Sequence, residues 1–477
     1  MLDSLTHRTS PRGRLHFPAI VVVSLLLGNV SQSVAQFAGG FGGQGGGGGG
    51  FGGQGGFPGG IAIDANGIVS ANTKTSGSTR LSKQRAEAFQ SEHLNRDVTA
   101  TSVLRKVSLN RLEEACTTLA DQNQAAPADM QFLAGLQRID FVFMYPETGD
   151  LVIAGPAGSF GPDNTGRMIG TESGRPVLRL DDLLVTLRTV KSAGLIGCSI
   201  DPTQEGLAAF SNFIRQNSSP ASTATIARRF QGMAAALGAQ NVSVQGVAPD
   251  SHFARTLVEA DYLMKMISIG RMQIPVRGFR SHLSMIPVGG NTMQRWWFTP
   301  LYDPFQKTPD GNAFAFSGQR VQLMSQDEQI SASGQRTQTA FKRVSTEAFA
   351  SQFTEKYEQV AAVTPVFAEL QNLIDLAVLA ALIQKEDLAT KAGWQMSLFL
   401  DAKRATVAQG RVPKTVDSSF NTRNAGRVII GLVAGGVTID ARSLLNSTPL
   451  VESTDRLLTG PAAASQPAAE HTHWWWD

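Results

Sequence analysis

The chain has 477 residues and a formal net charge of +3, from 42 Lys and Arg against 39 Asp and Glu. This length is enough for two domains with hydrophobic cores, because a domain usually holds on the order of 100–200 residues. The nearly balanced charge argues against a nucleic-acid-binding protein, whose affinity would come from neutralising phosphates.

An export signal is predicted over residues 1–35. Three arginines precede the apolar run 17–27, which is too short to remain in a bilayer as a span. Small residues then lead up to Ala35 and Gln36, between which we expect cleavage. An uncleaved anchor is the alternative. The mature protein is therefore expected in the periplasm or outside the cell.

Residues 36–60 are almost only glycine, with spaced phenylalanines. Such a segment cannot offset the entropy of its own ordering by burial, so we predict a flexible linker. We expect no transmembrane span after removal of the signal. The most apolar later segment, 366–383, is interrupted by Glu369, Asn372 and Asp375.

A mixed α/β domain is predicted over 61–270, around a central block in which strands and helices alternate. The expected strands are a hairpin over 59–69, a hairpin of 139–145 with 151–154, and single strands at 176–180, 195–200 and 242–247. The expected helices are 82–94, 111–120, 182–190, 202–216, 221–237 and one from 251 or 252 to 267.

Antiparallel strands plus helices are predicted over 271–458, followed by a disordered tail over 459–477. The expected strands are 293–299, a hairpin of 313–316 with 320–324, and 427–433 and 436–440; the expected helices are 345–357 and 365–384. The last helix is apolar nearly all round, so it should be buried between layers. The fold class expected is α+β, with a mixed sheet covered by helices and a second, more antiparallel layer.

Two cysteines, Cys116 and Cys198, lie in apolar surroundings, the first on a helical face and the second in the run 195–200. We expect both to be small buried hydrophobic residues. A disulfide between them is the alternative, because an oxidising compartment would permit it.

The candidate binding surface centres on the helix that begins after Asp250. His252 and Arg255 lie in its first turn, directly after a strand, where ligands often bind beside a sheet. The alternative is a solvated face on which Arg255 pairs with Glu259 and Asp261 with Lys265. The remaining candidates come from the long loop 155–174 and its end, and from a later strand with adjacent indoles: Arg167, Arg175, Trp296 and Trp297. Of the two indoles, we expect one in the core and one exposed.

No catalytic set or cofactor site is recognisable in the sequence. The segment 157–161 loosely matches a hydrolase serine elbow, but Pro162 and polar residues follow where that motif needs a helix. Only His93, His252 and His282 lie outside the signal and the tail, and their spacing fits no metal motif. We therefore predict neither a metal nor another cofactor.

Several motifs occur together between residues 139 and 383. They are MYPETGDLVIAGP (144–156), GRPVLRLDD (174–182), GCSIDP (197–202), DSHFAR (250–255), EADY (259–262) and QRWWFTP (294–300). Together they resemble a family of exported planctomycete proteins classed only as a domain of unknown function. The resemblance implies export and a shared fold, and it supplies no activity and no site residues.

Two functions from different classes follow from these observations. The favoured one is a non-catalytic envelope or extracellular protein that binds a partner protein or polymer. The alternative is an exported hydrolase that uses His252, Arg255 and residues of the loop 155–174 at the carboxyl ends of the central strands. Whether the protein is an enzyme stays open at this point.

Overall fold

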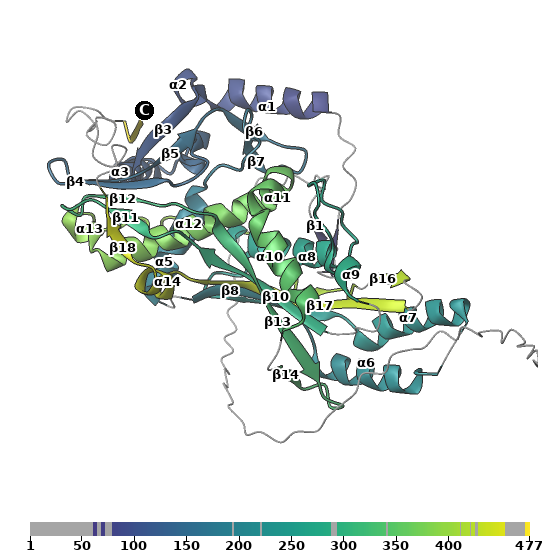
Figure 1. Ribbon diagram of the computed structural model, residues 1–477. Coiled ribbons are helices and arrows are strands. Elements are labelled where there is room, and N and C mark those ends of the chain that lie inside the picture. The colour runs from purple at the N-terminus through teal and green to yellow at the C-terminus, as the bar shows by residue number, and fades with distance from the viewer. Residues whose placement is uncertain are drawn as a thin grey trace, which may run out of the picture.

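The computed structural model describes residues 61–63, 68–71, 79–192, 195–219, 222–287, 293–339, 342–410, 412–419, 421–424, 428–453 and 473–477. The expected signal with its cleavage point between Ala35 and Gln36, and the glycine-rich linker, lie outside these residues. The described part contains two large mixed or antiparallel sheets with helices packed on them (Figure 1). The expected α+β class is confirmed.

The larger sheet has ten strands, of which most pairs are antiparallel, while β10 runs parallel to β17 and β15 to β2. Along the sheet the order is β1 (Ile61–Ile63), β2 (Ile68–Ala71), β15 (Thr415–Val416), β9 (Gln240–Gln245), β8 (Leu195–Pro202), β17 (Val428–Asp440), β10 (Met293–Leu301), β13 (Arg320–Ile330) and β14 (Arg336–Gln338), with β16 (Asn421–Asn424) paired to β17. The expected strands 427–433 and 436–440 are thus one continuous strand.

The second sheet has seven strands and carries the expected hairpin of β4 with β5. Its order is β18 (Leu450–Glu452), β11 (Phe305–Lys307), β12 (Ala313–Ala315), β4 (Phe141–Tyr145), β5 (Asp150–Ala157), β3 (Ser102–Ser108) and β19 (Trp475–Trp476). The long loop after β5 holds a separate short pair of strands, β6 (Phe160–Pro162) and β7 (Met168–Gly170).

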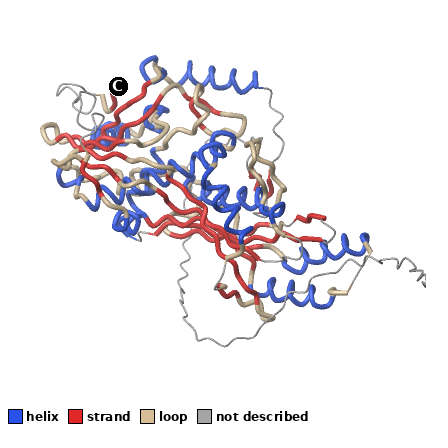
Figure 2. The backbone as a smooth tube through the Cα atoms, in the orientation of Figure 1, coloured by secondary structure: helices blue, strands red, loops and turns tan. Residues whose placement is uncertain are grey.

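The helices of the described residues follow the sequence pattern closely. They are α1 (Thr79–His93), α2 (Arg96–Thr99), α3 (Leu109–Asp121), α4 (Ala128–Gln131), the 3-10 turn η1 (Leu133–Gly135), α5 (Leu180–Ser192), α6 (Gln204–Gln216), α7 (Thr223–Leu237), α8 (His252–Ser268), α9 (His282–Met285), α10 (Val344–Glu355), α11 (Tyr357–Val363), α12 (Pro365–Lys385), α13 (Leu388–Lys391) and α14 (Ala441–Ser447). Figure 2 shows α6 and α7 on the other side of the larger sheet from α12.

Helix α12 forms the centre of the molecule, between the two sheets (Figure 1). Every residue from Val366 to Ile383 is buried, so the expectation of a helix buried between layers is confirmed. Among the described helices it is the one whose length and composition would let it cross a membrane, and that span is wholly enclosed by the protein. Because the helix is apolar on all sides, only an environment closed all round can cover it.

One continuous core joins the two parts of the chain that the sequence separates near residue 270. The larger sheet takes β8 and β9 from the first part and β10, β13 and β17 from the second. Core residues of both sheets also pack with α5, α8 and α12 in one cluster. The domain division stays a prediction about folding units, and a cut near residue 270 would separate strands that share hydrogen bonds.

Two expected β elements are wrong. Segment 176–180 makes only an isolated bridge at Pro176, and α5 begins at Leu180. Proline has no N–H, and the following amides divide between two neighbours, Val177 bonding Met168 and Leu178 bonding Leu136. The hairpin of 313–316 with 320–324 does not form either. Strand β12 pairs with β4 and β11, whereas β13 pairs with β10 in the other sheet.

The chain changes sheets at Arg320, which has a positive φ of 68°. Its guanidinium is buried and donates to the carboxylates of Asp140, at 2.8 Å, and Asp375 on α12, at 3.3 Å. These bonds hold a backbone conformation that a non-glycine residue rarely adopts. Hence β12 and β13 lie in different sheets even though only a few residues separate them.

The end of the chain also differs from the expected disorder over 459–477. Residues 475 and 476 form β19, which pairs antiparallel with β3, and Trp474 is buried. Disorder is therefore wrong for 473–477, while 459–472 lie outside the described residues. Consecutive tryptophans offer far more apolar surface for burial than the Ala, Ser and Pro before them, which explains why this short piece docks.

Both cysteines are buried free thiols, as expected for small hydrophobic residues, and they form no disulfide. Burial raises the pKa of Cys116 to about 12, and it raises that of Cys198 well above its usual value. Since the thiolate is the reactive form, both should react slowly. We expect the unreduced native protein to leave both thiols unlabelled by a thiol reagent over minutes and the unfolded protein to expose two. A count of zero after unfolding would contradict the structure.

Candidate functional site

Five charged side chains meet where the loop before α5 approaches the N-terminal ends of α5 and α8 and the second turn of α12. We call them the His252 cluster: Arg167, Asp182, His252, Glu259 and Glu369. Each side chain is at most 11% exposed. Buried charges of this kind persist in proteins only when they are paired.

Local sequence places each member. Ser251 caps α8 by accepting a hydrogen bond from the amide of Ala254 at 3.1 Å, and His252 follows in the first turn. Asp182 lies in the first turn of α5, where a carboxylate is favoured by the helix dipole. In the loop, the Asp163 side chain accepts from the amides of Thr165 and Arg167, and this turn directs Arg167 to the cluster.

The cluster is a chain of ion pairs. His252 Nδ1 lies 2.9 Å from Asp182 Oδ2, and its Nε2 lies 3.7 Å from Glu369 Oε1. Arg167 pairs with one glutamate on each of two helices. Its Nε lies 2.6 Å from Glu369 on α12, and its Nη2 lies 3.1 Å from Glu259 on α8. The cluster therefore ties the loop to three helices at once.

The electrostatic surroundings of His252 favour its protonated form. Burial alone would lower its pKa, but the Asp182 carboxylate, with Glu369 as a second acceptor, outweighs burial, so the pKa of His252 is raised. For Glu369, burial would raise the pKa, but Arg167 and His252 hold it well below the usual range. The two carboxylates on either side of the ring therefore stabilise the imidazolium form.

A cationic imidazole with both nitrogens facing carboxylates has no lone pair with which to accept a proton. In this state His252 cannot act as a general base. What the arrangement can do is fix the relative positions of α5, α8 and α12 through directional, charge-assisted contacts.

The raised pKa gives a pH prediction. A group whose pKa is higher in the folded state than its unfolded value of 6.5 contributes stability that is complete below that value and is lost as pH rises through the folded pKa. We therefore expect the stability difference between the wild type and His252→Gln to be largest in mildly acidic solution and to shrink towards alkaline pH. Urea unfolding at a series of pH values measures it.

His282 changes the pH dependence of stability in the opposite direction to His252. The pH dependence of the wild type alone would therefore mix the two effects, and the comparison with His252→Gln separates them. Burial, and then Arg343, lower the pKa of His282 to about 3, which costs stability as pH falls below 6.5. His282 is the same in both proteins and cancels in the difference. A difference that grows with rising pH would contradict a raised pKa of His252.

The structure distributes the predicted site residues over several places. Arg255 is half-buried and lies outside the cluster, and Glu259 pairs with Arg167 instead. Arg175 binds Gln371 at 2.8 Å and Glu358 at 3.2 Å, and Asp250 is exposed. The expected surface pair of Arg255 with Glu259 is therefore wrong.

The two tryptophans belong to a different region. Trp296 is fully buried among aromatic rings of the α10 side, and its Nε1 donates to the carbonyl of Thr346 at 3.3 Å. Trp297 is half-buried on the opposite face of β10. Their alternation follows the expected pattern of one core residue and one more exposed residue.

Residues 198–282 match a family of unknown function. The family's description is "Protein of unknown function (DUF1598)". No curated protein and no solved structure matches the chain. This DUF1598 region supplies His252 and Glu259 to the cluster, whereas Arg167, Asp182 and Glu369 come from the chain before and after it. The cluster therefore joins the DUF1598 region to its surroundings.

Sequence reasoning missed Asp182 and Glu369 as partners of His252. A signal for Glu369 was present, because a carboxylate in an otherwise apolar helix must find a cationic partner when that helix is buried. The partner itself, Arg167, could not be read from the sequence, since it lies about 200 residues earlier in a loop.

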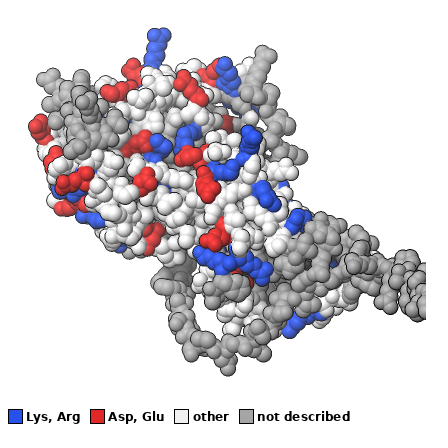
Figure 3. Space-filling view, in the orientation of Figure 1, with Lys and Arg blue, Asp and Glu red and all other residues white. Residues whose placement is uncertain are grey.

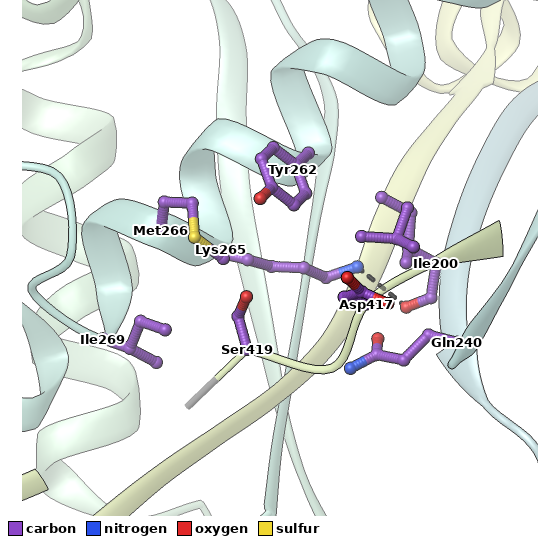
Figure 4. Close-up of a pocket in the computed structure, with 9 residues that line it drawn as sticks. Ile200, Gln240, Tyr262, Lys265, Met266, Ile269, Asp417 and Ser419 are labelled. Carbon is purple, nitrogen blue, oxygen red and sulfur yellow. Dashed lines mark hydrogen bonds between the residues drawn. The ribbon is translucent and has the colours of Figure 1, made fainter. Parts of the chain in front are cut away.

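A second buried pair lies on α8 inside the DUF1598 region. Lys265 Nζ donates to Asp261 and to the carbonyl of Ile200, both at 2.8 Å, so the expected surface pair forms but is buried. Burial outweighs Lys265 and raises the pKa of Asp261 to about 6. Figure 4 shows Lys265 reaching Ile200 across a small pocket lined by Ile200, Gln240, Tyr262, Lys265, Met266, Ile269, Val416, Asp417 and Ser419.

Proposed function

We propose that this protein acts outside the cytoplasmic membrane as a non-catalytic envelope or extracellular protein that binds a partner protein or polymer. The observation that carries the proposal is the environment of His252, which lies in the first turn of α8. The central strand β8 is antiparallel to both of its neighbours, β9 and β17, so the expected site at common carboxyl ends of the central strands does not form. The His252 side chain is nearly buried, its Nδ1 lies 2.9 Å from Asp182 and its Nε2 lies 3.7 Å from Glu369, and these carboxylates raise its pKa against the effect of burial. This is the geometry of a structural ion pair.

The export half of the proposal rests on the leader. Residues 1–35 have the positive start, short apolar stretch and small residues of a secretory signal. The glycine-rich residues that follow would act as a flexible linker between the N-terminus of the mature protein and its folded part.

The character of the surface favours a protein or polymer partner over a nucleic acid. On the face shown in Figure 3, Lys and Arg side chains alternate with Asp and Glu and form no basic band among the described residues. A nucleic-acid-binding face would concentrate positive charge along the track of the phosphates.

The hydrolase alternative would need a neutral imidazole open to a substrate and assisted by carboxylates of the loop 155–174. What that loop brings to His252 is Arg167, a cation, while the carboxylates come from α5 and α12. The surroundings of His252 therefore favour the non-catalytic proposal.

Envelope fractionation combined with cross-linking tests the proposal. We expect the protein outside the cytosol with Gln36 as its first residue, cross-linked to one main partner. Folded His252→Gln protein should retain that cross-link. Protein with an intact leader in the cytosol would overturn the export half. Hydrolysis of an ester, peptide or glycoside that is lost in folded His252→Gln protein would overturn the non-catalytic half.

A further inference from the structure

The seven-stranded sheet ends in a short strand that comes from the far end of the chain. Residues 474–477, which we call the tail strand, lie antiparallel along β3, with Trp475 opposite Val107 and Trp476 opposite Lys106. The amide of Ser108 donates to the carbonyl of Trp474 at 2.8 Å. Without the tail strand, β3 would be the edge of this sheet.

Arg105 of β3 recognises the acidic end of the tail strand. Its Nε and Nη2 donate to the two carboxylate oxygens of Asp477 at 2.9 and 3.0 Å, a bidentate pair. The Trp475 ring stacks on the guanidinium, with 4.5 Å between Cζ and the ring centroid. A carboxylate two residues after an aromatic ring is thus read by a single arginine.

The guanidinium of Arg105 is buried and is held in place by hydrogen bonds to the backbone. The Arg105 side chain is 0% exposed, and it donates to the carbonyls of Asp97, Val98, Ala100 and Ala134. These four carbonyls fix the guanidinium but leave its positive charge to be balanced by Asp477. An unbalanced cation at this depth is costly, so the site requires an anionic occupant.

The three tryptophans of the tail strand pack against hydrophobic clusters of the protein. Trp474 is buried in the main core, Trp475 packs near Phe132 and Phe160, and Trp476 packs near Phe143. The occupant is therefore defined by three successive indoles as well as by the acid. Such addition of a strand to an open sheet edge is a recurrent way of binding a peptide.

The segment that connects β18 to the tail strand is long enough for the tail strand to bind either its own molecule or a neighbouring one. Ser453 follows β18 at the opposite edge of the same sheet, about 30 Å away for six strand spacings. Residues 454–472 with their flanking bonds could span roughly 65 Å when extended. The tail strand can therefore reach the β3 edge of a neighbouring molecule as well.

We propose that the β3 edge with Arg105 is a recognition site for the tail strand that also works between molecules, so that one copy of the chain binds the tail strand of a second copy. This inference stands apart from the proposed function, because its partner is the chain itself. Exchange of one terminal strand between identical chains needs no contact beyond those already present within one molecule. Binding within one molecule competes through its high effective concentration, so exchange dominates only where that competition is removed.

The first test uses the chain without residues 474–477 as acceptor and a fluorescent peptide of residues 473–477 as probe. We expect saturable one-to-one binding, and at least about tenfold weaker binding of the same peptide with Asp477→Asn, which cannot balance the guanidinium. Arg96→Ala in the acceptor, an exposed arginine on the neighbouring α2, is the matched control and should change nothing. If the shortened chain does not fold, the full chain with Asp477→Asn serves as acceptor.

The second test mixes the shortened chain with an Arg105→Met chain, which keeps its tail strand but has lost the site. Light scattering should find a one-to-one complex in the mixture and monomers in each separate sample. If Arg105→Met does not fold, the unaltered chain at higher concentration replaces it as donor. A folded acceptor that ignores the peptide, or binds the peptide equally well with and without the Asp477→Asn substitution, overturns the recognition site. Peptide binding without a complex in the mixture overturns exchange between molecules.

Discussion

Replacing Arg167 with methionine is expected to lower the free energy of unfolding by about 3–5 kcal/mol. The substitution keeps most of the side-chain volume but removes the cation from between Glu259 and Glu369, which are 7% and 8% exposed. Glu259 would then lose its ion pair with Arg167, and Glu369 would keep His252, at 3.7 Å, as its remaining cationic partner among the described residues. Urea unfolding at neutral pH, followed by fluorescence and circular dichroism together, measures the change.

Arg175→Met is the matched control for that prediction. Arg175 comes from the end of the same loop, but its ionic partner, Glu358, is 49% exposed. A pair of this kind contributes about 0–1 kcal/mol, so the control should lose far less stability. Equal losses in the two variants would show that the loop itself, and not the buried charge, stabilises the fold.

Trp296→Ala is expected to destabilise the protein by about 3–5 kcal/mol, while the neighbouring Trp297→Ala should cost about 1 kcal/mol. Trp296 is fully buried, with its ring centroid 5.0 Å from that of Phe349 and 4.7 Å from that of His282. Trp297 lies on the opposite face of β10 and is only half-buried. The same change at adjacent positions therefore separates a core indole from a surface one.

Thermal unfolding of both tryptophan variants, with heat-capacity calorimetry on the wild type, measures this contrast. The two-state assumption needs checking by coincident probes, because a chain of this length can unfold in stages. Similar losses at both positions would contradict the burial pattern of β10. A partner that binds the wild type and Trp296→Ala but not folded Trp297→Ala would place a binding surface on the outer face of this strand.

The sequence predicts local structure well wherever one periodicity dominates. The helix α12 follows from a long apolar run that only a few polar residues interrupt, and the β4–β5 hairpin follows from the turn residues between two apolar strands. The α8 positions that a spacing of three and four residues predicts as buried, such as Phe253 and Leu257, are buried. The solvated face expected beside them is wrong, because Glu259 and Tyr262 are buried as well. The correctly predicted features depend on neighbours in the chain, which a single sequence displays directly.

Features that depend on distant parts of the chain could not be predicted. The pairing of Arg167 with Glu369 and of Arg105 with Asp477 joins positions that no local pattern connects. Nothing in the local sequence distinguishes Arg320 from an ordinary strand residue. Its ion pairs with Asp140 and Asp375 nevertheless stabilise the point at which the chain passes from one sheet to the other. The Ala, Ser and Pro residues that precede the tail strand led to a prediction of disorder for the whole segment 459–477, so the short strand β19 was not predicted.

The apolar segment that forms helix α12 affects how the unfolded chain would cross the membrane during export. Under the proposed export, an apolar helix of 21 residues must thread a translocation channel without escaping sideways into lipid. A carboxylate near the middle of such a helix opposes that escape by about 2.5–3.5 kcal/mol. Glu369 and Asp375, which find Arg167 and Arg320 after folding, would thus first serve as the groups that keep the unfolded segment in water.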